Sequence, residues 1–203
     1  MMKNNTNIVI IRQYGSGGRE VSSILAKKLN MTCYDRTIVQ LAAEQLSQQE
    51  NYEPNIDELI KNSYKRPQEQ MGNLGDFAFE RIPYFNKMYR QQAIVMLKLA
   101  QKGNAVFLGR CADVILKDIP NTYFFFIYAD DDFRAARAKN HYGNHTLADL
   151  DKEAKNREKY YAYYTGEKWG DPKHFHMMIN TSHISLEQAA DLIIDYIETH
   201  QKN

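Results

Sequence analysis

One stretch decides the fold: Ile8-Val9-Ile10-Ile11-Arg12-Gln13-Tyr14-Gly15-Ser16-Gly17-Gly18-Arg19-Glu20. Its run of β-branched residues predicts a buried strand, and apolar residues at three- and four-residue steps predict a helix directly after it. The loop between them has three glycines in four positions, so its backbone can approach an anion closely. A strand, a glycine-rich loop and a helix in this order are typical of a phosphate cradle, in which backbone N–H groups and the helix dipole hold negative charge.

The loop departs from the P-loop pattern G-x-x-x-x-G-K-[ST]. With Gly17 on the second glycine of the pattern, Arg12 stands at the first glycine. Gly18 then stands at the lysine, and Arg19 at the hydroxyl residue that binds magnesium. Two interpretations stay open. The loop either binds phosphate with another basic residue in place of the lysine, or is a glycine-rich turn of an ordinary α/β domain.

Length and composition narrow the class of protein. The 203 residues suit one α/β domain with insertions, or a core with a small lid. With 26 basic and 25 acidic residues the net charge is +1, so neither nucleic acid nor a membrane is expected as a partner. Cys33 and Cys111 are far apart and are expected to be reduced, buried thiols. We find no signal-peptide pattern and no apolar run near the ~20 residues of a membrane span, so a cytoplasmic protein is expected.

Five short apolar segments, separated by helical patterns, predict the sheet. They lie near residues 8–11, 32–34, 105–108, 122–128 and 177–179. Residues 122–128 are continuously apolar, which indicates burial on both faces, as in a parallel sheet. The alternation predicts an α/β three-layer sandwich, with a five-stranded parallel sheet, helices on both faces and residues 8–11 at the centre.

Two segments are expected to lie outside this core. Residues 47–86 are rich in Gln, Asn and Glu and contain three prolines, so we expect an inserted helical segment. It is either an arm that covers a substrate or a mobile insertion, and a helix over 87–102 follows it. Residues 138–172 hold a long helix around 146–164 and are expected to form a lid. The whole chain, 1–203, is thus expected to be one domain with an arm and a lid.

Charged residues follow the ends of the predicted strands, where ligands bind in open α/β sheets. They are Arg12 and Arg19 after the first strand, Asp35 and Arg36 after the second, Arg110 after the third, and Arg134, Arg137 and Arg157 after the fourth. Arginine suits phosphate because its guanidinium group is always charged and forms bidentate contacts. Phosphoryl transfer needs little more than alignment, magnesium and positive charge around the transferring group.

Other kinds of catalytic site find no support in the sequence. The histidines do not have the number or spacing of zinc ligands, so no metal-binding residue is expected. No serine lies in a G-x-S-x-G elbow, which leaves a hydrolase triad without support.

Several motifs together resemble the cytidylate-kinase-like family, which is related to the P-loop nucleoside monophosphate kinases. They are Ile11-Arg12-Gln13-Tyr14-Gly15-Ser16-Gly17-Gly18-Arg19-Glu20, Tyr34-Asp35, Gly109-Arg110-Cys111-Ala112-Asp113, Tyr163-Tyr164-Thr165-Gly166 with Trp169-Gly170-Asp171-Pro172, and Ile179-Asn180-Thr181-Ser182. The resemblance covers about residues 7–198. It implies a P-loop kinase-like fold with a nucleoside-monophosphate arm and a lid.

The resemblance also implies roles for single residues. Arg110 resembles the strand-end arginine that binds the phosphate of the monophosphate, and Asp35 resembles the aspartate after the second strand. The lid pattern R-D-x-x-D-x-x-R of the true cytidylate kinases is matched only at Asp151 and Arg157.

The chain also departs from the true monophosphate kinases on the donor side. Gly18 lacks the lysine charge that bridges the β- and γ-phosphates, and Glu20 stands at the threonine of the G-K-G-T sequence. The Glu20 carboxylate would repel phosphate unless a metal ion or Arg19 neutralises it. We therefore expect Arg19 to help bind the donor phosphate and to offset Glu20 in part.

These observations predict a kinase that transfers phosphate from ATP, with magnesium, to a nucleoside monophosphate, cytidylate by default. The alternatives are a non-catalytic nucleotide-binding or sensing protein and a kinase of another small phosphorylated metabolite. The expected ATP- and phosphate-binding residues are Arg12, Gly15, Ser16, Gly17, Gly18, Arg19 and Glu20. The expected acceptor-binding residues are Asp35, Arg36, Arg110 and Asp113. The expected catalytic charges are Arg19, Arg134, Arg137 and Arg157. The sequence does not indicate an oligomeric state.

Overall fold

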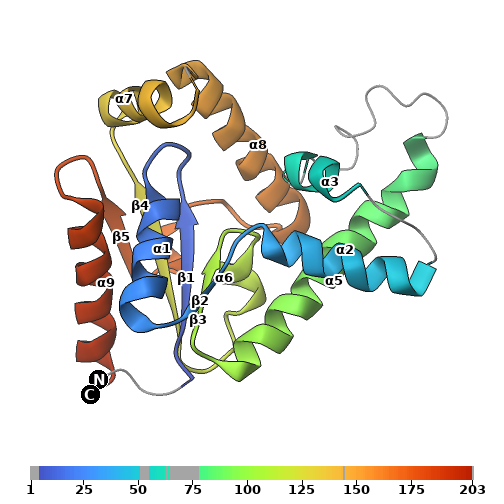
Figure 1. Ribbon diagram of the computed structural model, residues 1–203, viewed down its shortest axis with the longest axis horizontal. Coiled ribbons are helices and arrows are strands. Elements are labelled where there is room, and N and C mark those ends of the chain that lie inside the picture. The colour runs from blue at the N-terminus through green and yellow to red at the C-terminus, as the bar shows by residue number, and fades with distance from the viewer. Residues whose placement is uncertain (1–4, 51–54, 63, 65–77, 144, 203) are drawn as a thin grey trace.

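A parallel sheet of five strands forms the centre of the molecule (Figure 1). The structure is a computed structural model that describes residues 5–50, 55–62, 64, 78–143 and 145–202. The strands are β1 (Asn7–Arg12), β2 (Thr32–Tyr34), β3 (Ala105–Leu108), β4 (Thr122–Tyr128) and β5 (Met177–Asn180), in the order β2-β3-β1-β4-β5. Every neighbouring pair is parallel, and β1 is the central strand. The predicted parallel sheet is confirmed.

Helices cover both faces of this sheet. They are α1 (Gly18–Leu29), α2 (Thr37–Glu50), α3 (Ile56–Asn62), α5 (Ala78–Lys102), α6 (Ala112–Ile115), α7 (Asp131–His141), α8 (Leu147–Thr165) and α9 (Leu186–His200), with a short 3-10 helix at Pro172–His174. None of the described helices is long and apolar enough to cross a membrane.

Successive residues of the central strand face opposite layers. Ile8 and Ile10 pack in one buried cluster with residues of α1 and α9, whereas Val9 and Ile11 pack in a second cluster with residues of α2 and α5. Both layers are visible in Figure 1, with α1 and α9 on one side of the sheet and α2 and α5 on the other. Because both faces are covered, β1 is apolar without alternation, and the predicted three-layer sandwich is confirmed.

Local sequence signals fix several helix ends. α1 ends before Asn30, which adopts the left-handed conformation with φ 52°. Ser185 and Gln188 form the expected capping box at the start of α9. Thr146 and Asp149 form a second capping box at the start of α8, so the long helix of the expected lid begins where the sequence predicts.

The segment expected to form the arm differs from the prediction at both of its ends. Residues 47–50 continue α2, and α5 begins at Ala78 and not near residue 87. α5 therefore includes Pro83, one of the three prolines of this segment. α2 and α5 pack on each other within the second buried cluster. Residues 51–54, 63 and 65–77 of the expected arm lie outside the described residues.

Core packing predicts a large and local stability effect. Phe125 of β4 is fully buried, so Phe125→Ala should lower the free energy of unfolding by about 3–5 kcal/mol through lost apolar burial and a cavity. Ile94→Ala is the matched control, because Ile94 is exposed on α5 and its truncation should change stability by about 0.5 kcal/mol or less. Denaturant titration measures both values, and equal effects of the two changes would contradict the described layers.

Candidate functional site

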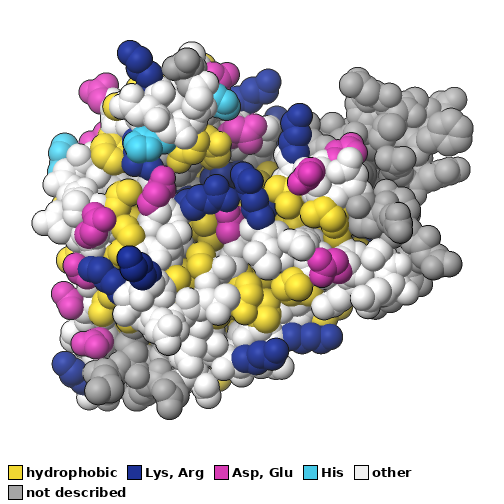
Figure 2. Space-filling model, in the orientation of Figure 1, with side chains coloured by type: hydrophobic (Ala, Val, Ile, Leu, Met, Phe, Trp, Pro, Cys, Tyr) yellow, Lys and Arg dark blue, Asp and Glu magenta, His cyan; other side chains and the backbone are white. Residues whose placement is uncertain are grey.

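A cavity of about 480 Å³ opens at the carboxyl ends of β1, β2 and β3. Six arginine or lysine side chains and three carboxylate side chains line it, so it is strongly positive. Figure 2 shows Lys and Arg side chains gathered near the middle of this face, between the loop after β1 and α3. In an open α/β sheet the ligand lies at this edge, and the lining charge favours an anion.

The glycine-rich loop forms one wall of this cavity. Gly15, Gly17 and Gly18 line it, and Gly17 precedes α1 in the left-handed conformation with φ 81°. No side chain caps the N-terminus of α1, so the N–H groups of its first turn lack partners within the helix. This open helix start next to a cavity is suited to bind phosphate.

Ser16, although part of the loop, faces away from this cavity. Its side chain is fully buried and donates a hydrogen bond to the carbonyl oxygen of Gln13 over 2.9 Å. The carbonyl oxygen of Ser16 accepts a hydrogen bond of 2.7 Å from the hydroxyl group of Thr181. Ser16 and Thr181 thus fix the shape of the loop from behind, while the glycines form its outer surface.

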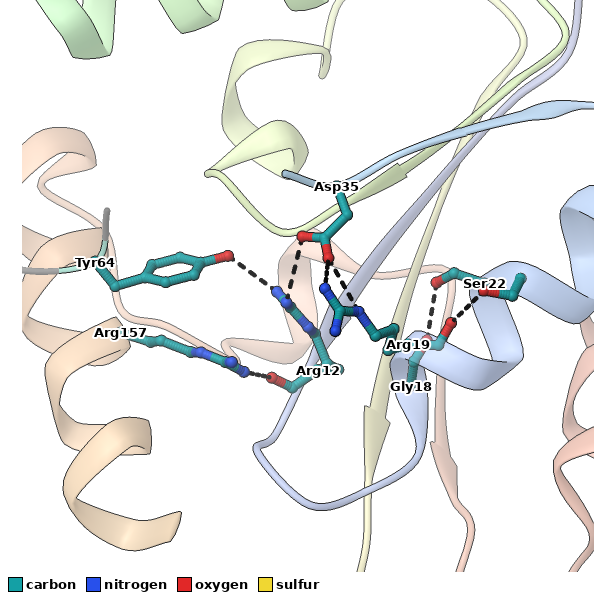
Figure 3. Close-up of polar contacts among 8 residues, drawn as sticks. Arg12, Gly18, Arg19, Ser22, Asp35, Tyr64 and Arg157 are labelled. Atoms are coloured by element: carbon teal, nitrogen blue, oxygen red, sulfur yellow. Dashed lines mark hydrogen bonds and ion pairs between the residues drawn. The ribbon is translucent and has the colours of Figure 1, made fainter. Parts of the chain in front are cut away.

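Arg12 extends from the end of β1 into the cavity (Figure 3). Its side chain is 10% exposed, and its Nη1 donates a hydrogen bond to the hydroxyl oxygen of Tyr64 over 3.0 Å. Its Nη2 lies 3.9 Å from a carboxylate oxygen of Asp35. Arg12 is therefore buried, charged and only loosely paired.

Two further arginines meet Arg12 around the ring of Tyr64. The guanidinium carbons of Arg110 and Arg157 lie 4.3 Å and 5.1 Å from the centre of this ring, within the range of cation–π contacts. Both side chains line the cavity, and Arg157 reaches it from α8. Burial and the neighbouring charge of Arg12 lower the pKa of Arg157 to about 10.

The turn that carries Arg110 is conformationally strained. Gly109, Arg110 and Cys111 have consecutive φ angles of 73°, 62° and 58°, all in the left-handed region. Residues other than glycine rarely adopt this conformation, and each costs free energy that the surrounding structure must offset. Strain of this kind clusters at binding sites, and here it places Arg110 at the cavity.

Arg19 and Asp35 form a pair at the rim of the cavity. Nε of Arg19 donates a hydrogen bond of 3.1 Å to Asp35, and the Arg19 side chain is 52% exposed. Burial would raise the pKa of Asp35, but the charges of Arg12 and Arg19 outweigh it and hold the pKa below its usual value. Arg19 thus faces the end of β2, and Arg36 lines the same wall. The predicted role of Arg19 at the donor phosphate stays a prediction.

Arg137, and not Arg19, pairs with Glu20. Its Nη2 contacts a carboxylate oxygen of Glu20. Arg19 was expected to offset this carboxylate, but its side chain contacts Asp35, whereas Arg137 reaches Glu20 from α7. α7 supplies the charge that neutralises the acidic residue of the first turn of α1.

Arg134 has an architectural position. Its side chain is 2% exposed, and its Nε donates to the carbonyl oxygen of Tyr14 over 2.9 Å. Its two terminal nitrogens pair with Asp131 at 2.9 Å and Asp151 at 2.7 Å. Arg134 therefore ties the glycine-rich loop to α7 and α8. Neither Arg134 nor Arg137 is among the residues that line the cavity.

Asp113 lies behind the cavity. It is 3% exposed, and one of its carboxylate oxygens accepts a hydrogen bond of 2.7 Å from the hydroxyl group of Tyr161 of α8. Burial raises the pKa of Asp113. Its contact with a ligand, expected from the resemblance, stays a prediction.

Sequence reasoning missed several residues that line the cavity. They are Gln13, Tyr14, Asp57, Ile60, Lys61, Tyr64, Tyr142, His145 and Glu153. Three of them belong to α3, which lies within the expected arm, and Tyr64 lies two residues after the end of α3. No pattern in the sequence separates Tyr64 from the other thirteen tyrosines, because the arginines that surround it are far from it along the chain.

The described residues do not fit a magnesium site made by the protein alone. No group of three or more His, Cys, Asp or Glu side chains in this part of the chain is placed to hold a metal ion. Ser16, the hydroxyl residue of the loop, faces its interior. Mg²⁺ commonly keeps water ligands and binds substrate phosphates, so an ion that enters with ATP would depend on the nucleotide for its ligands.

The arginines around Tyr64 predict a pH effect. Burial would raise the pKa of Tyr64, but Arg12, Arg110 and Arg157 outweigh it and lower the pKa to about 8, below the ordinary value of about 10. The stabilisation that follows should be complete above pH ~10 and be lost as the pH falls through about 8. Tyrosinate absorbance should show one early step that Tyr64→Phe removes.

Tyr163→Phe serves as the control for this titration, since Tyr163 is 42% exposed on α8. It should leave the early step in place. Titration of every tyrosine near the ordinary pKa of about 10 would contradict the described cluster.

Several solved structures are similar to this chain. The crystal structure of an uncharacterized protein from Eubacterium ventriosum ATCC 27560 has a TM-score of 0.69 and 26% sequence identity, covering 95% of this chain and 98% of that chain. Shikimate kinase from Bacteroides thetaiotaomicron has a TM-score of 0.55 and 12% identity, covering 95% and 98%. A gluconokinase from Sinorhizobium meliloti 1021 has a TM-score of 0.53 and 15% identity, covering 99% and 99%. The likeness to these two kinases shows the fold alone.

The family is shown by the sequence itself. A comparison with curated proteins finds no match. Residues 7–183, however, match the cytidylate kinase-like family. This match spans the whole sheet, the glycine-rich loop and all the arginines of the cavity. The chain therefore belongs to the cytidylate kinase-like family and has the α/β P-loop kinase fold.

Proposed function

We propose that this protein transfers a phosphoryl group from ATP, with magnesium, to a small phosphorylated metabolite, by default the nucleoside monophosphate cytidylate. One observation carries the proposal. A single cavity is bordered by the open N-terminus of α1 on one side and by the buried guanidinium groups of Arg110 and Arg157 on the other, with the guanidinium group of Arg12 between them. Two anion-binding walls in one cavity suit a reaction between two phosphates.

The donor nucleotide would occupy the wall formed by the loop. The N–H groups at the start of α1 would bind its phosphates, and Gly15, Gly17 and Gly18 allow close approach because they carry no side chain. Glu20 would not repel the nucleotide strongly, because Arg137 neutralises it. Arg134 would keep the loop in place through Tyr14 without touching the nucleotide.

The acceptor would occupy the opposite wall. Arg110 and Arg36 would bind its phosphate, and Asp35 would orient its remaining polar groups. Arg157 would join from α8, and its buried Nε, which has no hydrogen-bond partner among the described residues, would then donate to a phosphate oxygen. Asp113 would also hold Tyr161 of α8 in place through their hydrogen bond.

The reaction needs no proton transfer from the protein. An oxygen of the acceptor phosphate forms a bond to the γ-phosphorus of ATP, and the bond from that phosphorus to the bridging oxygen breaks, so that ADP leaves with this oxygen. The arginines would stabilise charge on the transferring group, and the protein would mainly align the two phosphates. In this proposal residues 47–86 act as the arm and 138–172 as the lid, which together exclude water in a cytoplasmic protein of one domain, 1–203.

Two alternatives have specific support. The missing P-loop lysine favours a protein that binds or senses a nucleotide without transferring phosphate. The fold relatives shikimate kinase and gluconokinase favour another small metabolite as acceptor, because their names refer to substrates that are not nucleotides.

A coupled assay of ATP consumption separates these possibilities. We expect magnesium-dependent turnover with at least one member of a panel of nucleoside monophosphates, with cytidylate tested first. Turnover only with other phosphorylated metabolites would move the acceptor to that class. ATP binding without turnover on any acceptor would favour the sensing protein and contradict the kinase.

Arg110 gives the sharpest test of the acceptor wall. Arg110→Ala should weaken acceptor binding by roughly ten- to a hundredfold and leave ATP affinity nearly unchanged, because a charge-assisted contact to phosphate is lost. Calorimetric titration measures both affinities. Arg90→Ala is the control, since Arg90 is exposed on α5, away from the cavity lining. Unchanged acceptor affinity together with a large loss of stability would make Arg110 structural.

A further inference from the structure

Gly18, at the position of the P-loop lysine, has no space for a side chain. A Cβ atom on Gly18 would lie 2.5 Å from the Cβ of Arg12, 3.0 Å from its Cγ and 3.3 Å from the Cβ of Ile127. Gly18 is the first residue of α1 and is not among the residues with a positive φ angle, so its backbone conformation does not require glycine. The stem of Arg12 occupies the space that a lysine side chain would need to leave the loop.

Gly109, which follows β3, leaves room for the guanidinium group of Arg12. A Cβ atom on Gly109 would overlap Nη1 of Arg12 and would lie 2.6 Å from the hydroxyl oxygen of Tyr64. The backbone of Gly109 has a φ of 73°, which also favours glycine. The side chain of Arg12 thus extends from one glycine to another, with its stem against Gly18 and its guanidinium group against Gly109.

This path places the Arg12 charge between the two walls of the cavity. Its guanidinium group lies between the glycine-rich loop and the turn that carries Arg110, and the residues of both walls line the same cavity. Its one described carboxylate partner, Asp35, is 3.9 Å away and binds Arg19 more closely. Most of the charge of Arg12 is therefore left to attract an anion.

Arg19, the other basic residue near the vacant lysine position, is less suited to this role. Its side chain is 52% exposed and is engaged with Asp35 at the rim. Its charge is therefore screened by solvent and by a close carboxylate. Arg12 is buried at the bottom of the same cavity, where a charge interacts more strongly with a bound phosphate.

We propose that Arg12 replaces the P-loop lysine, binding the donor phosphates from the strand side of the loop, and that Gly18 is glycine because Arg12 occupies its space. This inference rests on the proposed function, since it assigns a residue to the donor wall. It makes positions 12 and 18 a coupled pair, in which a side chain at one requires a glycine at the other. In the usual P-loop pattern, glycine stands at the position of Arg12 and lysine at the position of Gly18.

The coupling can be tested by exchanging the two residues. Arg12→Gly alone should weaken ATP binding by roughly ten- to a hundredfold through loss of a charge-assisted contact. Gly18→Lys alone should lower the melting temperature and ATP affinity together, because the new side chain collides with Arg12. The double variant Arg12→Gly/Gly18→Lys recreates the pattern G-x-x-x-x-G-K and should recover most of the lost affinity and stability. Calorimetric titration with ATP and magnesium, and thermal unfolding, give the two readouts.

Further variants keep this test decisive if Arg12→Gly folds poorly. Arg12→Gln retains a polar side chain but removes the charge, so it should retain stability and lose ATP affinity. Arg19→Ala should lose less ATP affinity than Arg12→Gln, and the exposed Arg90→Ala should lose none. Wild-type affinity in Arg12→Gln would overturn the inference. A double variant that binds ATP no better than Arg12→Gly would also overturn it, as would an undisturbed Gly18→Lys.

The inference and the proposed function fail in different ways. ATP binding by the wild type without turnover on any acceptor contradicts the kinase, and the exchange of Arg12 and Gly18 is still judged by binding. Turnover by the wild type, with ATP affinity unchanged in the Arg12 variants, overturns the inference alone. No binding of ATP by the wild type overturns both.

Discussion

Three buried positive charges that share one aromatic ring constrain the whole site. The guanidinium carbons of Arg12, Arg110 and Arg157 lie 5.9, 4.3 and 5.1 Å from the centre of the Tyr64 ring. Removing such charges from water is costly, and their mutual repulsion adds to the cost. The electron-rich face of the ring and the distant carboxylate of Asp35 offset this cost in part. A bound anion would offset far more of this cost, so the cluster is electrostatically suited to bind phosphate.

The elements around the cluster follow from the same constraint. α8 must lie close to β1, because Arg157 donates a hydrogen bond of 3.4 Å to the carbonyl oxygen of Arg12. Arg134 of α7 holds the glycine-rich loop and α8 together, because its one buried side chain contacts both Tyr14 and Asp151. The glycine-rich loop also packs closely against α8. A Cβ atom on Gly15 would lie 2.7 Å from Leu150 of α8 and would collide with it. The loop, the two helices and the arginines therefore form one packed unit.

Much of the fold was predictable from the sequence, but only part of the site was. Strand 122–128 was found because burial on both faces leaves a continuous apolar run, and α9 was delimited by the capping box at Ser185. The start of α5 was missed because a proline in a helix removes only one hydrogen bond, a loss that packing against α2 offsets. Arg134 was predicted to be a catalytic charge, a role that stays a prediction, and its ties to Tyr14 and Asp151 were not foreseen because spacing along a helix does not show what lies opposite a side chain. Tyr64 could not be found at all, because its partners come from β1, β3 and α8.

The strained turn after β3 favours transfer over mere sensing. In the proposed arrangement, a nucleotide sensor would need only the donor wall, which would consist of the loop, the start of α1 and Arg12. Gly109, Arg110 and Cys111, however, hold three consecutive left-handed conformations at the opposite wall. Such a turn persists only where the surrounding structure enforces it, here through the buried contacts of Arg110 with Tyr64 and of Cys111 with Tyr160 and Tyr161. A protein that binds one nucleotide has no need of this strain, whereas a protein that aligns a second phosphate with the first requires an arginine fixed at that wall.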